Sequence, residues 1–397
     1  MRILITNNGL ENRAGTELYV RDLAIALQRR GHEIVCFAPV LGDVAKEISD
    51  RGIEVVDTLS GLAPPDIIHG QHHNSAVLAY LAFPNVPAVQ LCHGVLPWQE
   101  APLARFANIR RYVAVDEACR AYLMQDHKIP EWAITCILNG VDLDRFTSTS
   151  LAKDSPARQK KALLYSNIAN PASLEPFQRA CRRAGFTLDV AGSGSGKVLD
   201  APETVLCEYG IVFAKARASL EAMASGCAVF LADYGKLGGL VTDDRFDALR
   251  PFNFGLRTLT EPVESTQIEA SLRQIDWDDA ASVSQHVRDE AGFEQVTSQW
   301  ESLYAELADQ PSVHDVTPVE ASANYLRAIL PQLAERDTLA AQHYHAVSAG
   351  IARDQDMSAS LTAALETGDS RRATAQTALR LDPSNKAARD WVERTKP

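Results

Sequence analysis

The sequence predicts an α/β protein with two parallel-sheet domains and an all-helical C-terminal extension. Short apolar runs alternate with helical patterns through residues 1–150, which is typical of parallel α/β sheets. The alternation resumes after a polar, proline-interrupted stretch at 148–161, which we interpret as a linker. Strand signals then stop in the C-terminal part. We therefore expect domains at 1–150 and 151–285, a closing helical segment at 286–310 and a helical extension at 311–397.

Composition and charge exclude several classes of protein. The 397 residues suffice for two or three domains, and the formal net charge of −12 argues against a nucleic-acid partner. The seven cysteines are scattered and never close-spaced, as expected of reduced core residues. No apolar run approaches the length of a membrane helix, about 18 residues, and the first residues resemble a strand rather than a signal peptide. We expect a cytoplasmic protein, with peripheral contact at the inner face of the cell membrane left open.

The first domain is predicted to contain seven strands and a long helix near its start. That helix should begin with Thr16 as its cap and end at Gly31. The loop at 7–15 joins the carboxyl end of the first strand to this helix, a position where phosphates and sugars bind in open α/β sheets. A plain polar turn is the alternative. The predicted strands are Arg2–Thr6, Glu33–Ala38, Ile53–Val56, Asp66–His69, Ala88–Cys92, Tyr112–Val115 and Ile134–Leu138.

Four histidines follow two of these strands. His69, His72 and His73 lie in one loop, and His93 lies in another that leaves the same edge of the sheet. Their spacing matches no common zinc motif, so zinc would require the two loops to converge in space. Neutral imidazoles also hydrogen-bond sugar hydroxyls. We favour that second interpretation and predict no metal site.

The stretch at 213–226 carries the strongest chemical signal. A buried strand at 209–213 leads into a segment of helical composition that should stop at Gly226. Lys215 and Arg217 fall in the expected first turn, where the helix dipole disfavours cations unless an anion binds between them and the free amides. Glu221 follows one turn later, and a buried carboxylate there needs a cation or a pair of sugar hydroxyls as its partner.

In this order and spacing, the motifs resemble those of GT-B glycosyltransferases of the retaining family 4 type. The likeness covers about residues 1 to 305. It begins with A-G-T-E-L-Y-V-R-D-L-A-I-A-L-Q-R-R-G-H-E-I and continues through P-D-I-I-H and C-H-G. It is strongest at V-A-V-D-E-A-C-R-A-Y-L and I-L-N-G-V-D-L-D-R-F, and L-E-A-M-A-S-G matches the nucleotide-sugar helix of the family. The resemblance implies two Rossmann-like domains facing a cleft, with a closing helix that crosses back to the first domain.

The same resemblance implies a nucleotide-sugar donor, an acceptor that is a glycan, a lipid-linked molecule or another hydroxyl compound, and no bound metal or other cofactor. Gly15 would lie near the donor diphosphate, His93 would face the transferred sugar and Glu221 would bind the ribose hydroxyls. Asn139 and Asp142 match the interdomain N-G-V-D motif, where a structural role is expected. The catalytic candidates are His93, Lys215 and Arg217.

The sequence departs from the family pattern in three places, one of which is a C-terminal domain that looks short by about one βα unit between Val190 and Tyr209. The glutamate expected eight residues before Glu221 is Phe213, and the loop at 165–175 lacks the usual arginine and lysine. We hypothesise that Lys215 and Arg217 supply the missing positive charge. The resemblance is to a subset of related sequences that share F-A-K-A-R-A-type helices and an N-F-G-x-R element, here at 253–257. The departures leave the donor open.

Two glycine-rich turns are further donor candidates. The run A-G-S-G-S-G-K-V is not a P-loop, because Ala191 and Val198 replace the first glycine and the magnesium-binding hydroxyl. Gly192 would instead border the donor in the GT-B fold. The run Y-G-K-L-G-G-L-V holds Gly238 and Gly239, whose amides could approach a sugar or phosphate; a flexible loop is the alternative.

The C-terminal extension has no strand signal, and residues 365–392 resemble one tetratricopeptide-type unit. One such unit cannot bury its own apolar face. It must pack on a second copy, on a partner protein or on its own catalytic domain. Three other functions stay open for the whole chain: a GT-B-fold nucleotide-sugar epimerase, a non-catalytic nucleotide-sugar or glycan-binding scaffold, and an adaptor built on the helical extension.

Overall fold

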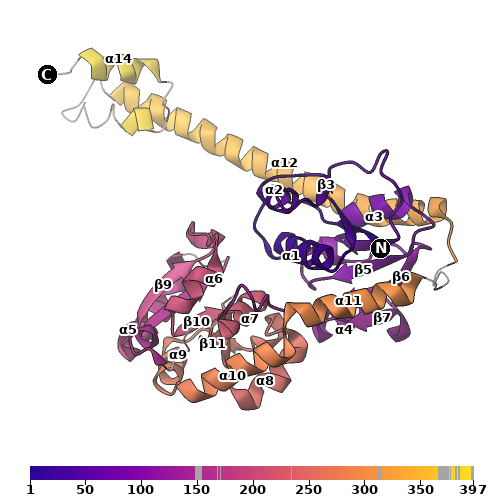
Figure 1. Ribbon diagram of the computed structural model, residues 1–397. Coiled ribbons are helices and arrows are strands. Elements are labelled where there is room, and N and C mark those ends of the chain that lie inside the picture. Colours follow the sequence, from indigo (N-terminus) through magenta and orange to yellow (C-terminus); the bar gives the residue numbers. More distant parts are fainter. Residues whose placement is uncertain are drawn as a thin grey trace. The chain divides into compact units, whose positions relative to one another are not determined.

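The computed structural model divides into two units, Met1–Ser322 and Ala323–Pro397. It describes residues 1–394 except 148–153, 168, 170, 234, 309, 311–314, 365–374, 376, 381 and 383–384. The first part of the predicted linker, 148–153, and half of the tetratricopeptide-like segment therefore lie outside the described residues. The first unit contains both sheets (Figure 1).

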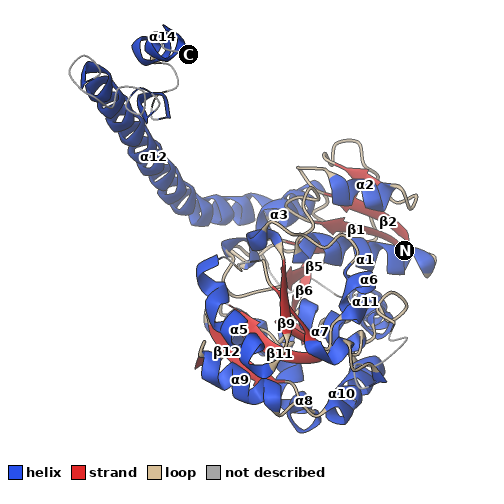
Figure 2. Ribbon diagram, turned by 90° about the vertical axis from the view of Figure 1, so that its left-hand side faces the viewer, coloured by secondary structure: helices blue, strands red, loops and turns tan. Residues whose placement is uncertain are grey.

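The first sheet is parallel throughout and has the order β3-β2-β1-β4-β5-β6-β7. Its strands are β1 (Arg2–Thr6), β2 (Glu33–Phe37), β3 (Glu54–Val56), β4 (Ile67–Gln71), β5 (Ala88–Cys92), β6 (Ile109–Ala114) and β7 (Ile134–Cys136). All seven predicted strands are present. Strands β4 and β5 are buried along their whole length, because helices cover both faces of a parallel sheet (Figure 2). The connecting helices are α1 (Gly15–Arg29), α2 (Asp43–Ser49), α3 (His73–Ala82) and α4 (Glu117–Gln125).

The second sheet has the order β13-β12-β11-β10-β8-β9, and only β8 to β11 run parallel. Its strands are β8 (Lys161–Tyr165), β9 (Thr187–Ala191), β10 (Ile211–Ala214), β11 (Ala228–Asp233), β12 (Lys236–Leu240) and β13 (Glu261–Pro262). Apolar clusters fill both faces of this sheet. The connecting helices are α5 (Pro171–Ala184), α6 (Pro202–Val205), α7 (Arg217–Ala224), α8 (Asp243–Leu249) and α9 (Ser265–Arg273).

Two local predictions are wrong. Thr16 does not cap α1: the N-cap is Ala14, and the Thr16 hydroxyl donates to Glu17 within the helix. The segment around Gly238 is a strand rather than a glycine loop, because it folds back as β12 and pairs antiparallel with β11.

Helix α11 (Phe293–Ala308) returns to the first sheet after α10 (Trp277–Glu290). Trp300 of α11 donates to the Tyr19 hydroxyl at 2.7 Å, and Tyr304 is fully buried. Arg30, at the end of α1, pairs with Glu294 and Glu301. The expected crossing helix is therefore present, and it holds the two sheets in one unit.

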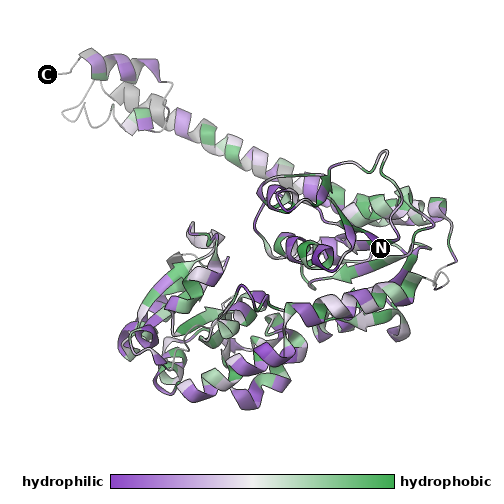
Figure 3. Cartoon of the chain, viewed as in Figure 1, coloured by the Kyte–Doolittle hydropathy of each residue, from purple (hydrophilic) through white to green (hydrophobic). Residues whose placement is uncertain are grey.

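The second unit contains most of α12 (Pro318–Ala364) and also α14 (Lys386–Arg394). Figure 3 shows hydrophobic and hydrophilic turns alternating along α12. Within the described part of the chain, no helix is both long enough and apolar enough to span a membrane.

Candidate active site

The histidine loops lie at the carboxyl edge of the first sheet, where β4 and β5 end. His93 is partly buried, and its Nε2 lies 2.8 Å from Oε1 of Gln71. Its ring also meets the Tyr19 ring edge-on at 4.9 Å. Burial lowers the pKa of His93 to about 4, so the imidazole is neutral at physiological pH. A neutral ring held in one orientation suits hydrogen bonding to a hydroxyl.

A chain of hydrogen bonds connects His93 to the crossing helix. Tyr304 Oη lies 2.6 Å from Nδ1 of His69, and Gln71 Nε2 lies 3.3 Å from Nε2 of His69. One set of tautomers satisfies every contact: His93 donates to Gln71, Gln71 donates to His69, and His69 donates to Tyr304. Burial lowers the pKa of His69 to about 3, which keeps this imidazole neutral. In this tautomer His93 leaves its Nδ1 as an acceptor.

Glu100 is the carboxylate beneath the same loops. It is only 2% exposed, accepts the backbone N–H of His93 at 2.9 Å and lies 3.3 Å from Nε2 of His72. Burial raises its pKa, but His72 and His93 lower it by more, so the carboxylate stays ionised. His72 has a φ of 56°, which non-glycine residues rarely adopt. Glu100 therefore orders two loops that converge in space.

On the second sheet, β10 leads into α7 through a turn at Lys215 and Ala216. The N-cap Ala216 has a φ of 52°, and its amide donates to Phe254 at 2.9 Å. Lys215 Nζ lies 3.2 Å from Oδ2 of Asp233, which also accepts the Ser166 hydroxyl at 2.6 Å. Lys215 therefore faces the carboxyl edge of the sheet, already paired with a carboxylate.

Arg217 bridges the two sheets. Its guanidinium donates to Asp22 of α1 and, at 2.7 Å, to Glu221 one turn further along α7. Burial alone would lower the pKa of Arg217, but the two carboxylates raise it above its ordinary value. Asp22 has a lowered pKa, because three arginines outweigh its desolvation, whereas burial raises the pKa of Glu221 despite Arg217. Asp22 is the better-compensated charge of the two.

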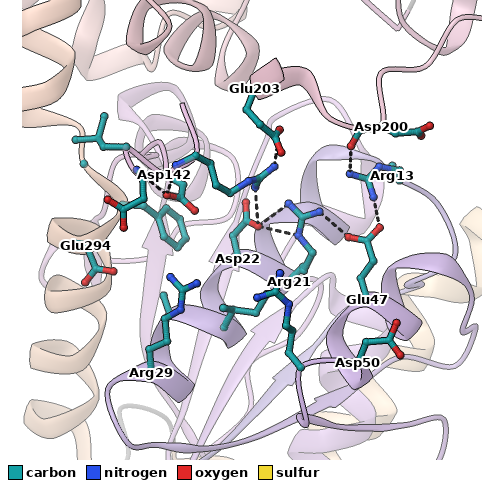
Figure 4. Close-up of a pocket in the computed structure, with 18 residues that line it drawn as sticks. Arg13, Arg21, Asp22, Arg29, Glu47, Asp50, Asp142, Asp200, Glu203 and Glu294 are labelled. Carbon is teal, nitrogen blue, oxygen red and sulfur yellow. Dashed lines mark hydrogen bonds and ion pairs between the residues drawn. The ribbon is translucent and has the colours of Figure 1, made fainter. Parts of the chain in front are cut away.

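Further ion pairs extend this contact (Figure 4). Asp22 also pairs with Arg21 at 2.7 Å and with Arg145 at 3.5 Å, and Arg145 reaches Glu203 at 2.9 Å. Together they border a cavity of about 520 Å³ between the two sheets. Other charged residues that line it are Arg13, Arg29, Glu47, Asp50, Arg51, Asp142, Asp144, Asp200 and Glu294. Cations and carboxylates are interspersed, so this cavity is not a positively charged pocket.

Residues 56–145 match the family model described as Glycosyltransferase Family 4. A glycosyltransferase from Rickettsia africae superposes with a TM-score of 0.60 at 16% identity, covering 78% of this chain and 99% of that one. Anabaena HepE, solved with UDP and glucose, has a TM-score of 0.54 at 15% identity and covers 77% of this chain and 100% of its own. The chain therefore has a GT-B fold, and the match to the family model is confined to residues 56–145. None of the curated proteins matches it.

A sucrose-phosphate synthase from Thermosynechococcus elongatus shares the GT-B fold, with a TM-score of 0.52 at 15% identity over 77% of this chain and 98% of that one. In this fold the cleft lies between the two sheets. Gly15 and His93 come after the carboxyl ends of β1 and β5, Lys215 follows β10, and Arg217 and Glu221 lie on α7. Arg217 contacts the first domain through Asp22. Gly15 is exposed at the first position of α1, and a Cβ added there would meet no described atom within 4 Å. It therefore leaves room for a ligand.

Three predicted donor residues have structural explanations in this GT-B chain. Gly192 has a φ of 127°, and a Cβ there would lie 2.1 Å from the carbonyl oxygen of Ser166, so close packing of two strand ends requires glycine. Within β12, a Cβ on Gly238 would lie 2.5 Å from the Thr258 carbonyl oxygen. Gly239 has a φ of 80°. Their packing and backbone conformation account for these glycines without a ligand.

Phe213 is fully buried in β10, which overlaps the strand predicted at 209–213. Its ring packs edge-on against Phe177 at 5.2 Å and also contacts Phe230. The position therefore supports the core of the second sheet, on the face that α5 and α9 cover. The expectation that Lys215 lies in the first turn of the following helix is wrong, because α7 begins at Arg217 and Lys215 lies in the turn before it.

The interdomain motif has the expected structural role. Asp142 accepts the backbone amides of Asp144 and Arg145 at 3.1 Å, and the Asn139 amide donates to Asn253. The Asn253 side chain also donates to the Val115 carbonyl, so N-F-G-L-R ties the second domain to the end of the first. Sequence reasoning noticed this element without assigning it a role.

Asp22 and Gln71 are the site residues that sequence reasoning missed. Asp22 sits next to Arg21 on α1, where a charged pair reads as an ordinary solvated helix face. Its burial depends on the second domain, about 200 residues later in the chain, as its contact with Arg217 shows.

Among the described residues no group of three or more His, Cys, Asp or Glu side chains is arranged to hold a metal ion.

Proposed function

We propose that this GT-B chain is a retaining glycosyltransferase that moves a sugar from a nucleotide-sugar donor to a hydroxyl acceptor. The observation that carries the proposal is the contact across the cleft, in which Asp22 of α1 reaches Arg217 at the start of α7. This contact joins α1, the helix that follows the glycine loop, to the candidate nucleotide-sugar helix. HepE, which shares this fold, was solved with UDP and glucose, and this supports a nucleoside diphosphate sugar as the donor class.

The donor ribose would bind Glu221 in place of Arg217. Glu221 is 5% exposed and its present partner is the Arg217 Nε at 2.7 Å, so a diol could replace one charge-assisted hydrogen bond by two. Arg217, released from Glu221, would then face the diphosphate together with the first amides of α7. These groups would stabilise the negative charge that grows on the leaving diphosphate.

The transferred sugar would lie against the histidine loops. His93 is neutral, and its Nδ1 would accept a sugar hydroxyl while Gln71 fixes the ring. The bond from the anomeric carbon to the donor phosphate breaks, and the acceptor oxygen attacks from the same face. The departing phosphate takes the proton of the acceptor hydroxyl. We propose no metal ion and no protein nucleophile in this reaction.

A binding screen tests the proposal first. Nucleoside diphosphates and their sugars should raise the melting temperature, since ligands stabilise by mass action. Glu221→Ala should weaken donor binding by about 1.5–3 kcal/mol, as expected for hydrogen bonds to a charged group. Arg217→Ala should lower turnover. Glu203→Ala is the matched control, because Glu203 pairs with Arg145 in the same ion network without touching α7 in the contacts seen.

A non-catalytic nucleotide-sugar-binding scaffold is the second candidate, and the paired cations favour it. Arg217 and Lys215 both already hold carboxylate partners, so a diphosphate must compete for them. Donor binding that depends on Glu221, without sugar release or transfer to any acceptor, would support this alternative. The seven cysteines are free, and we place either activity in the reducing cytoplasm. Peripheral contact with the membrane remains part of the proposal only for a lipid-linked acceptor.

A further inference from the structure

Helix α12 carries an exposed apolar stripe within the second unit. We define the α12 stripe as six large side chains that are each between 41% and 70% exposed. Scattered single apolar residues are normal on a surface, but a row of six along one helix marks an interaction site. The six residues are Leu326, Leu330, Leu333, Tyr344, Val347 and Ile351.

The spacing of the stripe is that of a coiled coil. Successive members are separated by intervals of four and three residues in each half, and the two halves stay in the same heptad register. At about 100° per residue the six side chains fall within an arc of about 100° on one side of the helix. Pro331 lies outside this arc, so its ring does not enter the stripe.

The stripe is also symmetric about its own midpoint. Counted forward from Leu326, the intervals are four and then three residues, and counted backward from Ile351 they are the same. The midpoint lies just after Thr338. If two copies of α12 pair antiparallel about this point, Leu326 faces Ile351 of the other copy. Leu330 likewise faces Val347, and Leu333 faces Tyr344. A closed two-fold interface requires such a self-complementary surface.

We propose that the α12 stripe is a dimer interface and that its occupant is the α12 stripe of a second copy, antiparallel. Burying each of these side chains removes on the order of 100 Å² from water. Six of them therefore bury roughly 600 Å² per copy, and the flanking side chains bring this near the ~800 Å² of a standard-size interface. Among the described residues of the C-terminal segment, Ala375, Ala378 and Ala388 are buried while the stripe stays exposed, so these described residues do not cover it.

Oligomeric state in solution tests the interface. Light scattering of the full chain at tens of micromolar should give a dimer. Leu333→Glu places a charge in two layers at once and should weaken dimerisation at least tenfold. Thr338→Glu, an exposed position of the same helix outside the stripe, should leave the dimer intact. A monomer at these concentrations, or a dimer that Leu333→Glu does not weaken, overturns the proposal. Binding of a different protein to the stripe of a monomer, in a one-to-one complex, would also overturn it.

Cross-linking tests the antiparallel pairing. Leu330→Cys and Val347→Cys chains, mixed and oxidised, should form a disulfide-linked heterodimer, whereas neither alone should cross-link. Cross-linking of Leu330→Cys with itself would indicate a parallel pair and refute the antiparallel arrangement. The parent chain, run alongside, controls for the partly exposed Cys136 and Cys207. The outcome does not depend on the proposed transferase activity.

Discussion

The two sides of the cleft fix their polar groups by different physical means. On the first sheet, neutral imidazoles are ordered by a chain of hydrogen bonds that links His93 to Tyr304. On the second, α7 is attached to α1 through Arg217 and its carboxylates. Hydrogen bonds between neutral groups depend on geometry, whereas buried ion pairs depend on keeping each charge compensated.

This difference assigns different roles to the two sides. If the proposed function is right, the histidine side would receive the neutral sugar with its hydrogen bonds already in place. The ionic side must exchange partners before an anion can bind, since Arg217 and Lys215 are each paired with a carboxylate. Preorganisation on one side and partner exchange on the other would make donor binding, rather than sugar positioning, the step that moves the domains.

The largest expected effect comes from acidification, which should lower the free energy of unfolding through the buried histidines. Burial lowers the pKa of His73 and His93 to about 4 and of His69 to about 3, against about 6.5 in the unfolded chain. Between pH 4 and 6.5 the unfolded state therefore binds more protons, so stability is full above pH 6.5 and falls on acidification. The slope is about 1.4 kcal/mol per pH unit for each imidazole and about 4 for the three.

Glu221 reduces this slope, because its raised pKa makes the folded state take up a proton first on acidification. Urea unfolding from pH 7 to 5 measures the balance. His69→Gln should reduce the slope by about 1.4 kcal/mol per pH unit. His345→Gln, on the exposed surface of α12, should leave it unchanged. If His69→Gln leaves the slope unchanged, this imidazole is not held neutral in the folded state.

Breaking the ionic side should have the next largest effect. Asp22→Ala removes the carboxylate shared by Arg21, Arg145 and Arg217. We expect the free energy of unfolding to fall by about 3 kcal/mol. This is the lower end of the range for a broken buried pair, because Arg217 is partly exposed. Lys46→Ala breaks the exposed Lys46–Asp50 pair on α2 and should leave the urea midpoint unchanged. Equal midpoints for the two variants would show that the bridge across the cleft adds no stability.

The sequence predicted the sheets far better than the contacts between them. Local alternation of apolar residues is enough to find β1 to β7, because each strand carries its own signal. The pairing of Asp22 with Arg217 depends on how two domains close, and no local pattern encodes it. Lys215 and Arg217, predicted to bind an anion, are instead paired with carboxylates in the structure, and their role in donor binding stays a prediction. Phe213 was found as a departure from the family pattern, but its reason, packing against Phe177 and Phe230, needed the second sheet.

The smallest expected effect tests whether the hydrogen-bonded chain acts as one unit. Tyr304→Phe removes the hydroxyl 2.6 Å from His69 Nδ1 and leaves that buried nitrogen without this partner, at a cost of about 1.5 kcal/mol. A purely structural loss would stop there. If the chain sets the tautomer of His93, however, the ¹⁵N shifts of His93 should also change, through His69 and Gln71. Tyr325→Phe, a mostly buried tyrosine in the second unit, should leave the His93 signals unmoved. Unchanged His93 shifts in Tyr304→Phe would mean that Gln71 alone orients the ring. The crossing helix would then stabilise the fold without reaching the site.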